Sequence, residues 1–147
     1  MDDQHKPEWI KVDEWDFVEY VDSLLRSQEA VDLEFKTARA GFPNSVWETY
    51  SSFANTDGGT IVLGIKEKNG ALFVEGLLPE QIVSYRQIIC NQLNNPDCVN
   101  VNLLTDKNIQ EVDYRGKSLL LIYVPRASRS QRPVYLTRNP LKGHTYK

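Results

Sequence analysis

Apolar residues recur along the chain with two different periods, and the alternation of these periods predicts a mixture of helices and strands. Spacings of three and four residues predict helices at 14–26, 45–55 and 79–93. Alternating or continuous apolar runs predict strands at 30–36, 60–65, 72–76, 98–104, 109–114, 118–124 and 133–136. This order predicts an α/β (α+β) fold, a single-domain sandwich in which a mixed, mostly antiparallel sheet is packed by about three helices.

Individual positions make the prediction more specific. Residues 60–65 form a nearly continuous apolar run, which is typical of a strand covered on both faces, so we expect this strand to be central. In helix 14–26, Asp13 is the expected N-cap, and the apolar face should consist of Trp15, Val18, Val21 and Leu25. The predicted core comprises Trp47, Phe53, Ile61, Leu63, Ile89, Leu121 and Ile122.

The length of 147 residues suits one core. We expect a polar N-terminal segment at 1–12 and one domain at 13–147, which forms the N-terminal part of a longer protein, because the sequence stops inside a predicted further strand. The start is acidic and polar, and no apolar run is long enough to span a bilayer. These features predict a cytoplasmic protein with no membrane partner.

Charge is distributed unevenly along the chain. Residues 1–75 carry 7 Lys/Arg against 15 Asp/Glu, whereas residues 76–147 carry 10 against 5. No acidic residue follows Asp113. Such a one-signed segment is typical either of an anion-binding face or of a basic surface that balances the acidic half of the same fold.

Several short motifs occur together in order. An E-x4-E-F-K element starts at Glu29, S-F-A-N-T-D-G-G-T occupies 52–60, and the apolar strand I-V-L-G-I follows at 61–65. R-P-V-Y at 132–135 and G-H-T-Y at 143–146 resemble closing strands. Over residues 26–147 this pattern resembles the AlbA-type domain of the Schlafen superfamily, found also in bacterial transcriptional regulators. The resemblance implies an α/β sandwich and a DNA-binding role in a bacterial transcriptional regulator.

The loop at Asn55, Gly58 and Gly59 allows two interpretations. Consecutive glycines permit positive φ and leave backbone N–H groups exposed, which can end a helix or cradle an anion. The Walker motif is absent, so helix termination is the simpler interpretation. Asn55 could cap the helix locally or reach across the sheet.

Three carboxylates suggest a second function. In Schlafen-type nucleases three acidic residues bind a divalent metal, and the resemblance places Glu29, Glu34 and Glu67 at these positions, with Glu instead of the usual Asp at the third. The implied enzyme is a metal-dependent endoribonuclease using Mg²⁺ or Mn²⁺. Glu29 and Glu34 are five residues apart and would face opposite sides of one regular strand, so they converge only if the chain bends. The alternative is a solvated acidic strand with surface ion pairs and no catalysis.

The candidate nucleic-acid-binding residues are basic and lie mostly near Tyr123 and Tyr135. Basic side chains interleaved with aromatic rings contact phosphates and stack on bases, so DNA or RNA is the expected partner. The set comprises Lys36, Arg126, Arg129, Arg132, Arg138 and Lys142. A third possibility is a protein-interaction or homodimerisation module that uses helix 14–26 or a sheet edge near Val134.

Overall fold

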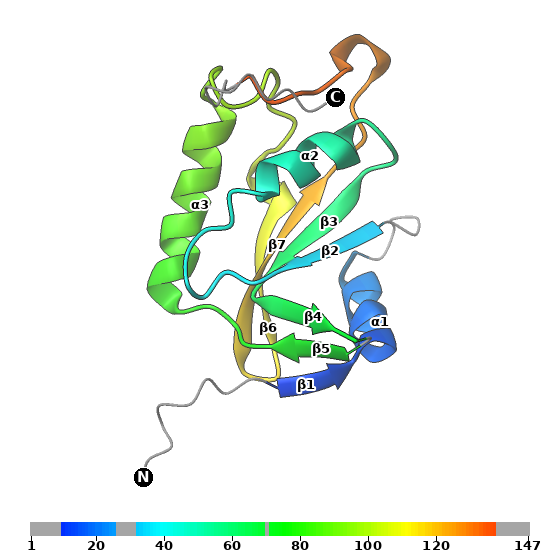
Figure 1. The fold of residues 1–147 in the computed structure, drawn as a ribbon, viewed down its shortest axis with the longest axis vertical. Coiled ribbons are helices and arrows are strands. Elements are labelled where there is room, and N and C mark those ends of the chain that lie inside the picture. The colour runs from blue at the N-terminus through cyan, green and yellow to red at the C-terminus, as the bar shows by residue number, and fades with distance from the viewer. Residues whose placement is uncertain (1–9, 26–31, 70, 138–147) are drawn as a thin grey trace.

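The computed structural model describes residues 10–25, 32–69 and 71–137, which form two β-sheets flanked by helices (Figure 1). The helices are α1 (Glu14–Leu25), α2 (Val46–Ala54) and α3 (Pro79–Leu93), with short 3₁₀ turns η2 (Asp106–Asn108) and η3 (Arg129–Gln131). The strands are β1 (Ile10–Asp13), β2 (Asp32–Lys36), β3 (Gly59–Leu63), β4 (Ile65–Lys68), β5 (Ala71–Val74), β6 (Ile109–Tyr114) and β7 (Lys117–Val124). Within these residues, no helix is long and apolar enough to cross a membrane. The predicted mixed α/β class with three helices is confirmed, although its strands form two sheets.

The larger sheet has the order β2-β3-β7-β6. β2 and β3 are parallel, whereas β7 pairs antiparallel with both β3 and β6. All five residues of β3 are buried because side chains cover both faces of the sheet. β3 lies between β2 and β7, so its predicted central position is confirmed.

The smaller sheet has the order β1-β5-β4 and is fully antiparallel. The chain leaves the larger sheet at Gly64, whose φ of +111° is readily adopted only by glycine. The Gly64 N–H donates to the Lys36 carbonyl, and the Gly64 carbonyl accepts from the N–H groups of Glu75 and Gly76. The apolar run predicted as one strand at 60–65 is therefore divided between two sheets.

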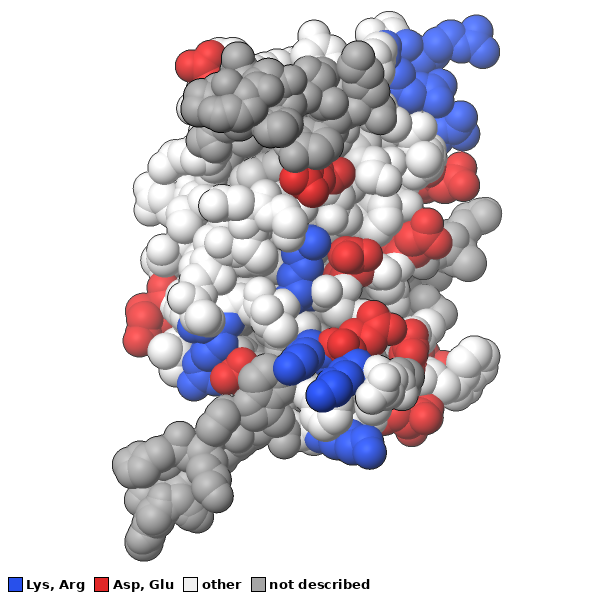
Figure 2. Space-filling view, viewed as in Figure 1, with Lys and Arg blue, Asp and Glu red and all other residues white. Residues whose placement is uncertain are grey.

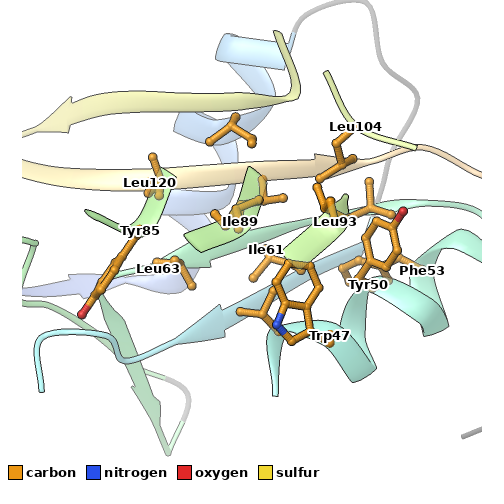
Figure 3. Packing of buried hydrophobic residues seen from close by; sticks show 14 of the residues in the cluster. Trp47, Tyr50, Phe53, Ile61, Leu63, Tyr85, Ile89, Leu93, Leu104 and Leu120 are labelled. Atoms are coloured by element: carbon orange, nitrogen blue, oxygen red, sulfur yellow. The ribbon is translucent and has the colours of Figure 1, made fainter. Parts of the chain in front are cut away.

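Two hydrophobic clusters lie on opposite faces of the larger sheet. The first packs α2 and α3 against β3 and β7, and Figure 3 shows Trp47, Ile61, Ile89 and Leu120 among its side chains. The second lies between the opposite face, the small sheet and α1. Every residue of the predicted core is buried, at most 8% exposed, and Leu121 belongs to the second cluster.

The predicted apolar face of the first helix is wrong at Trp15, which is 68% exposed. Phe17 is fully buried instead and contacts the rings of Phe35 and Tyr114, with centroids 5.8 and 5.0 Å away. β1 places Glu14 directly at the start of α1 and so fixes which side of the helix faces the sheet. Because each residue turns a helix by about 100°, Trp15 then points away from the core. The side chains of Val21 and Leu25 lie outside the described residues.

Two predicted strands are also wrong, and one observed strand was not expected. Residues 98–104 and 133–136 share only an isolated bridge between Val99 and Leu136. Side-chain amides, rather than a neighbouring strand, satisfy much of the backbone of 133–135. β1 overlaps the polar N-terminal segment that was expected at 1–12. This stretch forms a strand despite its polarity because the partner β5 supplies most of the apolar surface.

Candidate nucleic-acid interface

Residues 125–137, which we call the arginine segment, are attached to α2 by the side chain of Asn55. Its Nδ2 donates to the Val134 carbonyl at 2.7 Å, and its Oδ1 accepts from the Val134 N–H at 2.8 Å. Ser51 Oγ donates to the same carbonyl at 2.7 Å. Of the two possibilities that the sequence left open for Asn55, the structure shows contact with a distant segment.

Asn100 holds the same segment from the other side. Its Nδ2 donates to the Pro133 carbonyl at 3.1 Å, and its Oδ1 accepts from the Tyr135 N–H at 2.8 Å. Near the start of the segment, the Ala127 N–H donates to the Ala54 carbonyl at 2.8 Å. The segment is irregular, but it is fixed near its start by the end of α2 and in its second half by two asparagine side chains.

Gly58 and Gly59 provide the close packing that this attachment needs. Gly58 has φ +86°, and its N–H donates to the Phe53 carbonyl at 2.8 Å, which ends α2. A Cβ at Gly58 would lie 2.8 Å from the Val124 carbonyl oxygen, and one at Gly59 would lie 2.6 Å from the Phe53 ring. Both glycines are buried, which favours helix termination over an anion cradle.

Tyr50 fixes the neighbouring irregular segment at 98–105. Its hydroxyl donates to the Val101 carbonyl at 2.7 Å and accepts from the Leu103 N–H at 2.9 Å. Burial raises the pKa of Tyr50 to about 12, an effect that the Leu103 N–H partly opposes. The hydroxyl is therefore a neutral donor at physiological pH, and it supports the chain that carries Asn100.

The arginine segment presents cations that pair with no carboxylate of the described residues. Arg126 and Arg129 are exposed, and Arg132 is half-buried. Tyr135, which follows them in the segment, is 38% exposed. In the part of the chain that the structure describes, none of the three arginines forms an ion pair. Arg138 and Lys142 lie outside the described residues. Unpaired guanidinium groups on an acid-free segment are suited to bind phosphate oxygens.

Lys36 does not join the arginines. It lies at the end of β2, where Nζ donates to Ser45 Oγ at 3.0 Å and approaches Glu34 Oε2 at 3.8 Å. In Figure 1 this position is well separated from the 126–132 stretch, drawn in orange at the upper right. The structure thus divides the described members of the predicted basic set between two locations.

Only two of the three predicted carboxylates lie in the described residues. Glu34 is exposed on β2, Glu67 is exposed on the adjacent β4, and Glu29 lies outside the described residues. Glu67 and Lys36 line one hollow of about 360 Å³, together with Ser45. Across residues 10–25, 32–69 and 71–137, no three His, Cys, Asp or Glu side chains gather as a metal site would require.

A larger hollow of about 770 Å³ lies beside the first, between the 37–43 loop and the small sheet. Its charged lining consists of Arg39, Lys66 and Glu75, and Arg39 Nη1 lies 3.6 Å from Glu75 Oε2. Sequence reasoning missed these residues. They are far apart along the chain and share no motif, so only the contact between the loop and the sheet could reveal them.

Comparisons with known proteins agree with this architecture. The family model described as Schlafen, AlbA_2 matches residues 29–147. The solution structure of the N-terminal domain of an ATP-dependent DNA helicase RecG-related protein from Nitrosomonas europaea is similar, with a TM-score of 0.60 and 29% identity. That match covers 88% of this chain and 86% of the other.

A second solved structure, the DIP2311 protein from Corynebacterium diphtheriae, matches with a TM-score of 0.49 and 21% identity. The match covers 84% of this chain but only 24% of that one. A search of curated proteins found no match.

Proposed function

Because the chain belongs to the Schlafen AlbA_2 family, we propose that it is a nucleic-acid-binding domain that holds DNA through the arginine segment. One observation carries this proposal. Arg126, Arg129 and Arg132 have no ion-pair partner in the described structure, on a segment that contains no acidic residue. The similar Nitrosomonas europaea domain comes from a protein described as DNA helicase RecG-related, which supports DNA over RNA as the ligand.

The mode of binding follows from the residue types. Guanidinium groups bind phosphate oxygens with paired, charge-assisted hydrogen bonds, and such contacts position a protein on DNA without reading its sequence. The described helices offer no basic recognition helix, since α1 and α2 contain no Lys or Arg and α3 contains only Arg86. In a bacterial transcriptional regulator, the finer role we propose, sequence selection would belong to another part of the protein.

The test measures binding to short labelled duplexes by fluorescence anisotropy at several salt concentrations. Replacing Arg126, Arg129 and Arg132 by Ala should weaken binding equally for unrelated sequences. It should also lower the slope of log affinity against log salt by about 0.9 for each phosphate that the variant no longer neutralises. Arg86→Ala with Lys107→Ala, two cations outside the segment, should leave both quantities unchanged. Absence of any duplex binding by the unaltered protein at low salt would contradict the proposal.

A metal-dependent ribonuclease is the second candidate, favoured by one observation. Lys36, a cation suited to hold a phosphate, lies 3.8 Å from Glu34 and shares a hollow with Glu67. Glu34 and Glu67 are the two proposed ligands that lie in the described residues, and a bound Mg²⁺ or Mn²⁺ would supply a Lewis acid for phosphodiester cleavage. RNA cleavage that requires Mn²⁺ or Mg²⁺ and disappears in Glu34→Gln and Glu67→Gln would support this function. Cleavage that survives both substitutions would exclude it.

A further inference from the structure

The small sheet places an aromatic ring between two lysines. In the register of its three strands, Lys11 of β1 is opposite Phe73 of β5, and Phe73 is opposite Lys66 of β4. Directly opposite residues of antiparallel strands point to the same face, with Cβ atoms about 5 Å apart. Phe73 is therefore flanked on both sides by lysine side chains.

The same face is open to solvent. Val12, Leu72 and Val74 point into the second hydrophobic cluster, so the alternate residues point outward. The outward row contains exposed Lys11, Lys66 and Lys68 and half-buried Ala71 and Phe73. We call this surface the lysine face.

On the outward positions of the small sheet, three lysines outnumber two carboxylates, Asp13 and Glu75. Lys11, Lys66 and Lys68 have no ion-pair partner in the described structure. Both carboxylates on the outward positions, Asp13 and Glu75, have partners within the domain. Asp13 accepts a hydrogen bond from the Asp16 N–H at the start of α1, and Glu75 lies 3.6 Å from Arg39. Glu67 alternates with Lys66 and Lys68 and belongs to the opposite side of β4.

The lysine face is distant from the arginine segment. In Figure 1, β1, β4 and β5 lie in the lower part of the molecule, whereas the 126–132 stretch lies at the upper right. Figure 2 shows blue side chains over the small sheet, with red side chains directly beside them, and a separate blue group at the upper right corner. The molecule thus carries two cationic surfaces with different compositions, arginines on a loop and lysines around a ring.

We propose that the lysine face binds single-stranded DNA, with an unpaired base stacked on Phe73 and the adjacent phosphates held by Lys11 and Lys66. A solvent-facing aromatic ring on a sheet stacks on any unpaired base, but duplex bases are already stacked and cannot reach it. Flanking ammonium groups complement the phosphate charge on both sides of that base. The 770 Å³ hollow, also lined by Lys66, continues from this face and gives space for a neighbouring nucleotide.

DNA is the occupant to which the proposal commits, because the chain resembles the N-terminal domain of a DNA helicase RecG-related protein. The site goes beyond the duplex-binding function proposed for the arginine segment and uses none of its residues. Its failure is therefore distinguishable from failure of that function.

The test measures anisotropy of labelled oligothymidine and of a labelled duplex with the same set of proteins. Phe73→Leu keeps an apolar side chain but removes the aromatic face, and it should weaken oligothymidine binding about tenfold. Lys11→Gln with Lys66→Gln should lower the salt slope for oligothymidine by about 0.7 for each phosphate that the variant no longer neutralises. Duplex binding should remain unchanged in these variants.

Trp15→Leu is the matched control, since it removes an exposed aromatic ring from α1 and should leave oligothymidine binding intact. Thermal melting confirms that each variant is folded. Unchanged oligothymidine binding in both lysine-face variants would overturn the proposal, as would no binding by the unaltered protein at low salt. Tighter binding of oligouridine than of oligothymidine would overturn the assignment to DNA.

Discussion

The arginine segment and the lysine face carry the same sign of charge but are held in place differently. Irregular chain carries the arginines, and side-chain hydrogen bonds from Asn55, Ser51 and Asn100 fix it. The lysines stand on β1 and β4, whose positions are set by backbone pairing with β5. A surface on a loop therefore depends on a few specific contacts, whereas a surface on a sheet depends on many equivalent ones.

This difference predicts where single substitutions act. A change in the α2 end or in Asn55 should disturb the arginine segment without altering the lysine face. A change in the lysines should remove charge from the small sheet without altering its pairing, because side chains on the solvent face add little to the ladder.

Gly58→Ala should have the largest effect. The substitution combines a left-handed backbone at φ +86° with a Cβ only 2.8 Å from the Val124 carbonyl oxygen, where the arginine segment begins. Strain and overpacking together should lower the free energy of unfolding by about 3–4 kcal/mol. Urea denaturation measures this decrease.

Gly41→Ala is the control for this prediction. Its Cβ would have nothing within 4 Å, and it should change stability by less than about 0.5 kcal/mol. Equal destabilisation in the two variants would show that the α2 end is not closely packed against residue 124.

Alkaline pH should have the next largest effect. The pKa of Tyr50 is raised from 10.0 to about 12, so the folded protein retains this proton more strongly than the unfolded chain. The resulting stabilisation is complete below pH 10 and disappears as pH rises from 10 towards 12, by about 2–3 kcal/mol in total. Thermal melts across this range measure the change. In Tyr50→Phe the pH dependence should become shallower, and an unchanged profile would contradict the assignment to Tyr50.

Asn55→Ala should cost about 2 kcal/mol. It leaves the N–H of fully buried Val134 without its acceptor, while Ser51 still donates to the Val134 carbonyl. Duplex binding should weaken because the arginines lose their fixed position, whereas oligothymidine binding should not change. Asn91→Ala, which removes an exposed asparagine of α3 whose side chain forms no hydrogen bond with the described residues, is the control. Equal weakening of both binding activities in Asn55→Ala would mean that the two surfaces are not independent.

Lys11→Gln with Lys66→Gln should have the smallest effect on stability. Neither lysine has an ion-pair partner in the described residues, and both are exposed, so unfolding free energy should change by less than about 0.5 kcal/mol. Urea denaturation provides the measurement. A larger decrease would show that the lysines stabilise the small sheet itself and are not free for a ligand.

The sequence alone determined the elements that have a strong internal pattern. The continuous apolar run predicted the central strand, and helical spacing predicted α2, α3 and their buried residues Trp47 and Ile89. These predictions succeeded because burial of a whole strand or of one side of a helix requires apolar residues at regular spacings in the local sequence. The family motifs could be recognised in the sequence for the same reason, because the turn at 55–59 is formed by consecutive residues.

Only the tertiary structure decided where separate segments meet. The exposure of Trp15 depends on how β1 leads into α1, and the division of 60–65 between two sheets depends on Gly64 contacting both Lys36 and Glu75. The partnership of Asn55 with Val134 joins residues 79 positions apart. The pairing of Lys11, Phe73 and Lys66 likewise requires strand register, which no single segment contains. The local sequence sets the spacing of apolar residues in each element, but contacts between elements depend on the packing of the whole chain.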